Sequence, residues 1–248
     1  MATGYINRTG ISLVSGLLKP AFYPDSPVFR TIELELFGSA TYDWIYSMWE
    51  MHHHASIGAL LGGTAQLKLR YTYSDEIFLG QRFNTGGFQS SLTGRYSNWF
   101  SGSVVYRRNR AIYYSADPFG GLSNRLSVSA VFQPWPKFET TLSFVYSDFF
   151  RESDQSKVYQ YPIERFKLTY QFNKYLFIRG IIEYNGYRKS LVTDFLVSFT
   201  YIPGTVGYLG YGSLYEQSDE TQPFFTGDLK PMEMQRGFFL KLSYLFRN

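Results

Sequence analysis

The sequence contains no cysteine in its 248 residues, which excludes a disulfide scaffold, a thiolate metal site and a cysteine nucleophile. Long apolar runs are also missing, since stretches such as 57–63 and 195–202 are far shorter than the roughly 18 residues of a membrane-spanning helix. The net charge of +4 is scattered, so we expect no nucleic-acid partner. The opening residues do not form a signal peptide, and we expect that one has been removed or that a longer chain precedes them.

Aromatic residues and a two-residue periodicity are what the sequence has in abundance. Its 22 Tyr, 23 Phe and 4 Trp make 20 % of the chain, whereas charged residues make only 18 %, below the usual quarter or so. In the segment 165–172, apolar residues such as Phe166 and Leu168 alternate with polar ones such as Arg165 and Lys167. No convincing helical period of 3.6 residues occurs, so the pattern predicts an all-β protein.

The alternation predicts a series of strands that runs along the whole chain. We expect thirteen strands, near residues 8–20, 29–41, 50–61, 64–76, 86–96, 99–110, 123–133, 137–149, 161–172, 176–187, 191–202, 205–215 and 235–246. Bacterial single-chain outer-membrane barrels have an even count. An odd count therefore predicts either one miscounted strand, giving twelve or fourteen, or further strands upstream.

Short and long connections alternate between these strands. Turn-forming residues fill the short ones at 62–64, 97–99, 134–137, 173–175 and 203–205, and polar segments fill the long ones at 42–51, 74–87, 111–124, 150–161 and 216–235. A sandwich would mix loop lengths at both ends, whereas outer-membrane barrels have short periplasmic turns and long outer loops. We therefore predict a single domain, residues 1–248, that folds as a transmembrane antiparallel up-and-down β-barrel of about 12 to 14 strands.

The two faces of the strands decide whether lipid or water lies outside. Aromatic residues recur at the strand ends, as in the interfacial girdles of membrane barrels, and a soluble lipocalin-like or sandwich core would have difficulty packing so many rings. We therefore expect the apolar face to contact outer-membrane lipid in a Gram-negative bacterium. The charged residues share the other face and are expected to line the pore: Glu33, Glu35, Lys68, Arg70, Arg95, Arg107, Glu139, Arg165, Lys167, Arg179, Glu183, Asp194 and Lys241.

The last strand carries the pattern of a barrel assembly signal. A glycine is followed by spaced apolar residues and a terminal aromatic, namely Gly237, Leu240, Leu242, Tyr244 and Phe246. This predicts the barrel assembly machinery as a partner. Because an amphipathic edge strand is prone to aggregate, we also expect the last strand to close against the first.

Several segments taken in order resemble a known family. They are GYINRTGI, FRTIELEL, NWFSGSVVY, SVSAVFQPWPKFETTLSFVYSDF and RGFFLKLSYLFRN. Together they are similar to the C-terminal β-barrel domain, of unknown function, in Bacteroidota outer-membrane proteins that carry an N-terminal family-9-type carbohydrate-binding module. The sequence lacks that module and the first part of the family's barrel region. The resemblance implies a role in carbohydrate uptake or processing and transfers no catalytic residue.

Three adjacent histidines are the clearest candidates for chemistry. His52 and His54 share a strand face about 7 Å apart, and a metal site there would need a third ligand such as Glu50 or Asp43. A hydrolase would instead pair His54 with Ser56 on the same face, but the sequence lacks the GxSxG motif. We predict no enzyme, no metal and no cofactor.

The functional prediction follows from the charged face. Eight of its thirteen charged residues are basic and five are acidic, which favours anions in a porin-like channel. Alternatively, these charges pair across neighbouring strands and fill the interior. We predict an outer-membrane channel or membrane anchor; a barrel-embedded lipid or ester hydrolase and a structural subunit of a larger outer-membrane complex are the alternatives.

Overall fold

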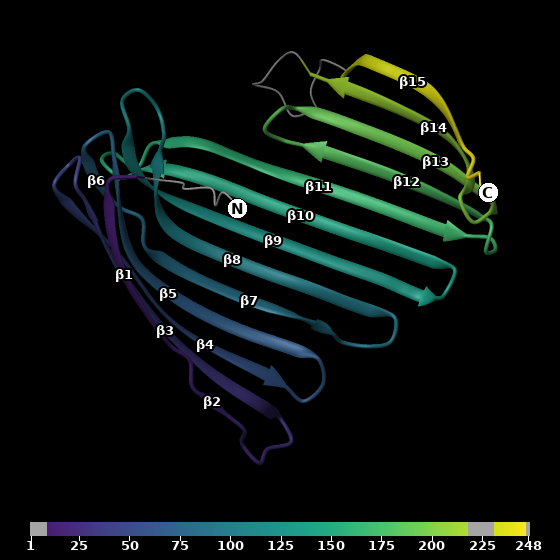
Figure 1. Cartoon of the computed structure of the whole chain (residues 1–248). Helices are drawn as coiled ribbons and strands as arrows, with labels where there is room; N and C mark the ends of the chain where they lie inside the picture. The colour runs from purple at the N-terminus through teal and green to yellow at the C-terminus, as the bar shows by residue number, and fades with distance from the viewer. Residues whose placement is uncertain (1–8, 218–230, 247–248) are drawn as a thin grey trace. The chain divides into compact units, whose positions relative to one another are not determined.

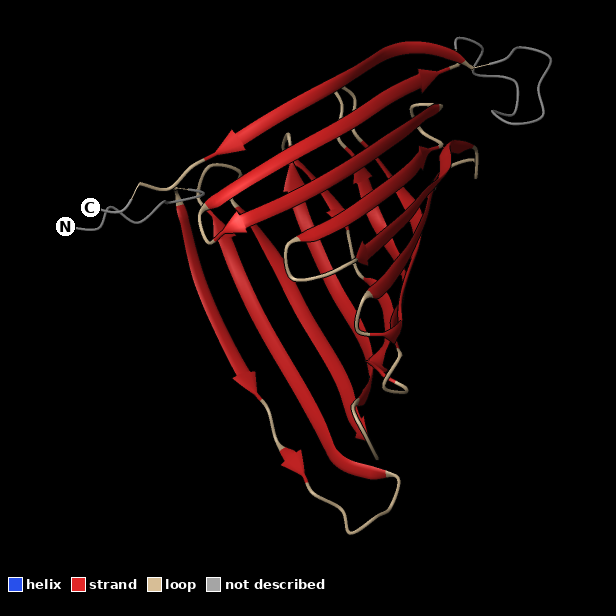
Figure 2. Cartoon of the chain, turned by 90° about the vertical axis from the view of Figure 1, so that its right-hand side faces the viewer, coloured by secondary structure: helices blue, strands red, loops and turns tan. Residues whose placement is uncertain are grey.

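The computed structural model describes residues 9–217 and 231–246, which form strands and turns and no helix (Figures 1 and 2). The all-β prediction is confirmed. The strands are β1 (Ile11–Leu18), β2 (Ala21–Phe22), β3 (Phe29–Asp43), β4 (Met48–Leu61), β5 (Ala65–Phe78), β6 (Gln81–Asn84), β7 (Gly87–Arg95), β8 (Phe100–Tyr113), β9 (Phe119–Trp135), β10 (Phe138–Arg151), β11 (Lys157–Gln171), β12 (Leu176–Asn185), β13 (Ser190–Ile202), β14 (Thr205–Glu216) and β15 (Met232–Ser243).

The strands form one up-and-down sheet in sequence order. Its path is β1-β3-β4-β5-β7-β8-β9-β10-β11-β12-β13-β14-β15, which gives the thirteen strands that the sequence predicts. β2 and β6 lie off this path and prolong their neighbours. β2 follows β1 along β3, where Ala21 pairs with Glu33, and β6 precedes β7 along β5, where Asp75 pairs with Asn84. A break around Gly86 separates β6 from β7, and the Gly86 amide donates to Asn84 Oδ1 at 3.1 Å.

The first and last strands of the sheet path each have one described partner strand. Within the described residues, β1 pairs with β3, β15 pairs with β14, and no ladder joins β1 to β15. Thirteen alternating strands leave β1 and β15 running in the same direction, so an antiparallel ladder between them is impossible. β15 also ends at Ser243, so Tyr244 and Phe246, which were predicted to lie in the last strand, follow it instead.

Most connections predicted to be long are short, because the strands continue into the polar segments. The predicted loop 74–87 contains the end of β5 and all of β6, joined at Leu79 and Gly80 with φ angles of 49° and 74°. Two central residues with positive φ define a tight hairpin turn, and leucine is an uncommon residue type at such a position. Only 44–47, 114–118 and 152–156 remain of three other long connections. Most of the predicted loop 216–235 lies outside the described residues.

The chain divides into two compact units, which we describe separately. Unit 1 comprises residues 1–93, 105–125 and 148–159, and unit 2 comprises residues 94–104, 126–147 and 160–248. In unit 1, Leu36 pairs with Ala55 and Ala55 with Tyr71, so one sheet face is apolar. Rows of the same kind cross unit 2: Phe195, Tyr211 and Phe238 form one, and Val197, Leu209 and Leu240 form the next.

The burial pattern is the reverse of a soluble core. Among the described residues, the buried hydrophobic side chains are Ile77, Ile112, Phe149 and Leu196, whereas most of the large apolar residues on the rows above are exposed. Buried polar residues outnumber them: Asp43, Ser56, Ser74, Ser147, Asp148, Ser190, Ser198, Ser213 and Gln217. Since burying apolar side chains drives the folding of soluble domains, this sheet needs another partner for its apolar face.

Candidate functional site

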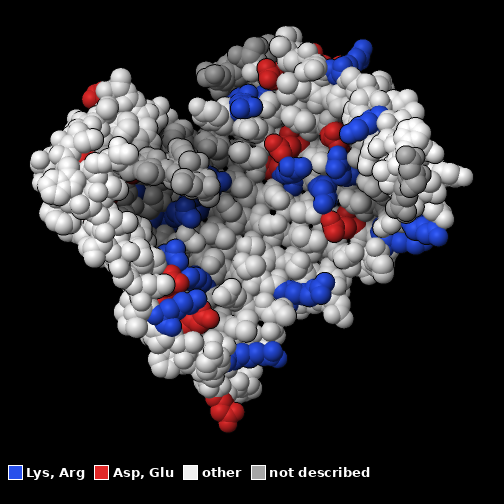
Figure 3. Space-filling model, in the orientation of Figure 1, with Lys and Arg blue, Asp and Glu red and all other residues white. Residues whose placement is uncertain are grey.

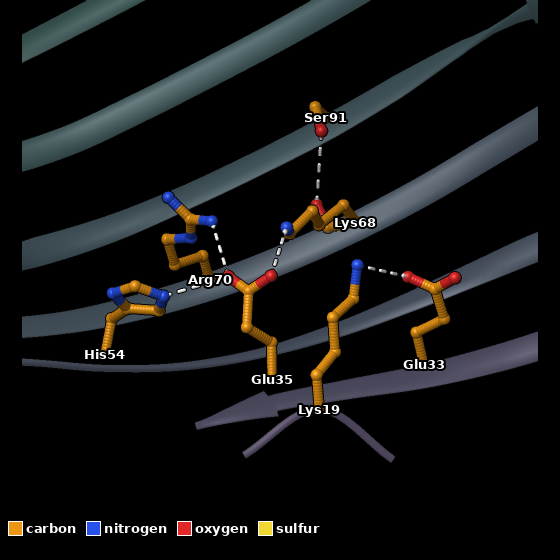
Figure 4. A network of polar contacts seen from close by, with 7 residues as sticks. All are labelled: Lys19, Glu33, Glu35, His54, Lys68, Arg70 and Ser91. Atoms are coloured by element: carbon orange, nitrogen blue, oxygen red, sulfur yellow. Dashed lines mark hydrogen bonds and ion pairs between the residues drawn. The ribbon is translucent and has the colours of Figure 1, made fainter. Parts of the chain in front are cut away.

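The charged residues of unit 1 meet at one carboxylate, Glu35 on β3 (Figure 4). The His54 Nε2 atom lies 2.9 Å from Glu35 Oε1, and Arg70 donates to the same oxygen at 2.9 Å. The Lys68 Nζ atom lies 3.5 Å from Glu35 Oε2. The Glu35 side chain is only 15 % exposed, so these three groups take up most of its accepting capacity. We call Glu35, His54, Lys68 and Arg70 the Glu35 hub.

Strand register assembles this hub from three neighbouring strands. Glu35 pairs with Ser56 on β4, Ser56 pairs with Arg70 on β5, and Arg70 pairs with Gln89 on β7. Residues paired across a sheet point to the same face, so this polar row crosses four strands. Arg107 on β8 lengthens it, because its Nε and Nη2 atoms donate to Gln89 Oε1 at 3.2 and 2.9 Å.

A second ion pair lies beside the hub on the same face. The Lys19 Nζ atom, next to the end of β1, lies 3.2 Å from Glu33 Oε2 (Figure 4). Glu33 and Glu35 are two residues apart on β3 and therefore share a face. The structure brings the predicted residues Glu33, Glu35, Lys68, Arg70 and Arg107 together on this face, and Lys19 is an addition that the predicted list lacked.

In unit 2 the charged residues form separate pairs between adjacent strands. The closest N···O distances are 3.1 Å for Lys167 and Glu139, 3.5 Å for Arg165 and Glu183, and 3.2 Å for Arg179 and Asp194. All six side chains are about a third to a half exposed. Mixed clusters of basic and acidic side chains are visible in Figure 3. Each pair is therefore a solvated contact of modest strength.

Positive charge is left over after this pairing. Each of the five predicted acidic residues forms an ion pair with a basic side chain. Arg107 instead binds the neutral amide of Gln89, and Lys241 has no acidic partner in the part of the chain that the structure describes. The Glu35 hub adds to the excess, because one carboxylate serves both Lys68 and Arg70. The predicted charged residues therefore carry more positive than negative charge after pairing.

The three histidines do not act together. His52 and His54 lie on the charged face with ring centroids 5.7 Å apart, whereas His53 points to the other face and stacks on Tyr73 at 6.4 Å. Among the residues described, no group of three His, Cys, Asp or Glu side chains is placed to hold a metal ion.

Each third metal ligand considered from the sequence has another role. Glu50 accepts a hydrogen bond from the Ile77 amide at 2.6 Å. Asp43 accepts hydrogen bonds from the amides of Ile45 and Tyr46 at 2.7 and 3.0 Å. The Asp43 carboxylate therefore stabilises the turn that follows it, and the Glu50 carboxylate binds the backbone of the neighbouring strand β5.

The hydrolase alternative needs His54 and Ser56 to form a hydrogen-bonded pair. His54 and Ser56 share the charged face, and Ser56 is buried. The His54 Nε2 atom contacts Glu35, and within the described residues no hydrogen bond joins His54 to Ser56. A general base must reach the proton that it abstracts, and in this structure the His54 Nε2 atom is engaged by Glu35.

Sequence reasoning missed an aromatic cluster in unit 1. Tyr113 stacks on Phe119 at 4.9 Å, Phe149 stacks on Tyr159 at 5.6 Å, and Phe119 and Phe149 are 6.2 Å apart. The Arg151 guanidinium lies 4.1 Å from the centre of the Phe119 ring. Phe149 is ten residues after Glu139 on β10, so the alternation alone assigns it to the charged face.

Two loop residues near this cluster have shifted pKa values. Burial raises the pKa of Tyr114, and the hydrogen bond from its hydroxyl to Glu76 at 3.0 Å raises it further. The Ser156 hydroxyl donates to Asp154 at 2.7 Å and lowers the pKa of that carboxyl. Both groups lie in connections between strands.

The predicted assembly-signal residues occupy an exposed strand and its continuation. Gly237, Leu240 and Leu242 lie in β15, whose twelve residues are all exposed. Tyr244 and Phe246 follow the strand, with ring centroids 4.6 Å apart.

No family model matches the chain, and no curated protein resembles it at a significant level. In the described residues no helix is long and apolar enough to cross a membrane.

Proposed function

We propose that the chain is a β-barrel protein of the bacterial outer membrane, or part of one, that passes anionic solutes along its charged face. The observation that carries the proposal is the burial pattern, with apolar rows exposed and serine and aspartate buried. In lipid, an exposed apolar face is solvated and a polar face is turned inward.

Aromatic residues near the short turns of unit 2 support a membrane interface. Ring centroids are 4.9 Å apart for Phe100 and Phe132, 5.1 Å for Trp135 and Phe138, and 4.8 Å for Tyr170 and Phe172. Paired aromatic rings at strand ends are typical of the girdles that position barrels at the headgroup level.

The resemblance to the barrel domain of Bacteroidota proteins with a carbohydrate-binding module suggests the context. On that basis we expect the protein to serve as channel or membrane anchor in a carbohydrate uptake or processing system. A second candidate role is that of a structural subunit in a larger outer-membrane complex, and the edges of β1 and β15 favour it because the described residues give each of these strands a partner strand on one side only.

Planar bilayers test the proposal. Protein refolded into outer-membrane lipid should give ohmic conductance steps, and a KCl gradient should give a reversal potential on the anion-selective side. A folded, membrane-inserted preparation that stays silent would support the structural role instead. Apolar rows that are exposed to water should cause aggregation. Protein that remains monodisperse in buffer without detergent would therefore overturn the membrane assignment altogether.

A further inference from the structure

β15 is an open edge of unit 2. It pairs with β14 from Val206↔Ser243 to Glu216↔Met232, and no described strand of unit 2 pairs with its other side. An edge of twelve residues presents a row of unpaired backbone N–H and C=O groups, which is a template for another strand. If the proposed membrane location holds, these groups face lipid, where each unpaired one costs several kcal/mol.

The apolar rows of unit 2 also stop at this edge. Phe238, Leu240 and Leu242 are 80 %, 69 % and 76 % exposed, whereas Leu209, which pairs with Leu240 from β14, is 52 % exposed. The additional exposure is on the flank where a neighbouring strand would lie. A strand placed there would extend the rows with apolar side chains at alternate positions.

Charge on the other face identifies the chemistry of that strand. Arg165, Lys167 and Arg179 in unit 2 each pair with a carboxylate on an adjacent strand. Lys241 shares their face, but its partner on β14 is Tyr208, and the described residues give it no carboxylate. The pattern calls for an acidic residue on the missing neighbour.

A second copy of the chain does not fit this edge in a bilayer. Antiparallel pairing of β15 with β15 of a copy requires a two-fold axis perpendicular to the strands. Such an axis lies roughly in the plane of the membrane, so the copy would be inserted upside down. β1 of a copy in the same orientation would run parallel to β15, because thirteen alternating strands separate the two edges.

We propose that the β15 edge binds an amphipathic β-strand of another polypeptide segment, which runs antiparallel to β15. Its apolar side chains continue the rows of Phe238, Leu240 and Leu242, and a carboxylate on its other face pairs with Lys241. The inference rests on the proposed outer-membrane location and specifies the partner of the structural role.

Two synthetic peptides of alternating leucine and threonine provide the test, one with a central glutamate and one with a central lysine. The full chain is refolded into phosphatidylcholine vesicles, and hydrogen exchange of the β15 amides is followed with each peptide. We expect fast exchange at about every second β15 amide without peptide and protection with the glutamate peptide. The wild-type chain should prefer the glutamate peptide by about two- to five-fold, and Lys241→Glu should reverse the preference.

Each result separates the edge from the membrane assignment. Protection of β15 without any peptide would show that the edge is already paired, with another strand of the same chain or with a copy, and would overturn the inference. Exposed β15 amides that neither peptide protects would overturn it as well, even in inserted protein. Failure to insert into vesicles would count against the proposed function alone, because peptide protection can then be measured in detergent micelles. A scrambled peptide without alternation is the control and should leave β15 unprotected.

Discussion

The charged faces of the two units are built differently. In unit 1, Glu35 receives His54, Lys68 and Arg70 and is 15 % exposed. In unit 2, Lys167, Arg165 and Arg179 each have a carboxylate of their own at a more exposed position. Replacing the Glu35 carboxylate therefore removes the charged partner of three side chains, whereas replacing a carboxylate of unit 2 removes the partner of one. In the hub of unit 1 the ion-pair contacts depend on the single carboxylate of Glu35, whereas in these pairs of unit 2 they are divided among three carboxylates.

Neutralising the hub should have the largest effect. Glu35→Gln leaves Lys68, Arg70 and His54 close together without a carboxylate, and we expect it to lower the free energy of unfolding by about 3 kcal/mol. The extra positive charge should also shift the reversal potential further toward anion selectivity. Urea unfolding in vesicles and bilayer recording in a salt gradient measure the two effects.

Glu139→Gln in unit 2 is the matched control, because it removes a carboxylate from one exposed pair with Lys167. It should cost less than about 1 kcal/mol. Equal losses for the two variants would show that the hub is only a set of independent surface pairs.

The two units also differ in how tightly an aromatic ring packs against a glycine. A methyl group at Gly121 would collide with the ring of Phe149 and with the Phe150 carbonyl oxygen. Phe149 is buried and cannot move aside, so Gly121→Ala should cost about 2 kcal/mol. At Gly210 the three atoms nearest to the methyl group would all belong to the ring of Phe239, which lies on the exposed edge strand and can rotate away at a cost of about 1 kcal/mol.

Gly16→Ala is the control for both glycine variants, because nothing lies within 4 Å of the added methyl group. It should be neutral or slightly stabilising. Unfolding midpoints rank the three variants, and a larger loss for Gly210→Ala than for Gly121→Ala would contradict the ranking by burial.

The pairs of unit 2 should behave independently. Asp194→Asn removes the 3.2 Å contact with Arg179 and should cost about 0.5 kcal/mol. Combined with Glu139→Gln, the two losses should add within about 0.5 kcal/mol, since the pairs share no residue. In unit 1, Glu35→Gln and Lys68→Met should instead be strongly non-additive. A large coupling between Asp194 and Glu139 would mean that unit 2 contains a network after all.

The strands could be read from the sequence because alternation is a local signal. The predicted strand 64–76 corresponds to β5 at 65–78, and the predicted charged face places Glu35, Lys68 and Arg70 together. Local signals do not give register, so the convergence of three donors on Glu35 could not be predicted. The strands are longer than predicted at turns such as Leu79-Gly80, because leucine is not a residue type that signals a tight hairpin turn.

The closure of the last strand against the first stays a prediction, because amphipathic end strands indicate a partner without specifying which. Phe238, Leu240 and Leu242 have the apolar alternation of a paired strand, yet the thirteen-strand count prevents an antiparallel ladder with β1. The odd count was visible in the sequence, and it was the more informative signal of the two.

The smallest expected effect is at the loop carboxylate Asp154, between β10 and β11. Its pKa is lowered chiefly by the Ser156 hydroxyl and also by the Ser156 amide, which donate at 2.7 and 3.0 Å. A depressed folded-state pKa stabilises the loop above the unfolded pKa of about 3.9, and this stabilisation is lost as pH falls through the folded value. Ser156→Ala should therefore raise the Asp154 pKa toward its ordinary value in an NMR titration. Because the carboxyl is fully exposed, conductance and the unfolding midpoint at neutral pH should stay unchanged. A variant that weakened the Glu35 hub from this loop would show that the hub depends on the loops as well as on strand register.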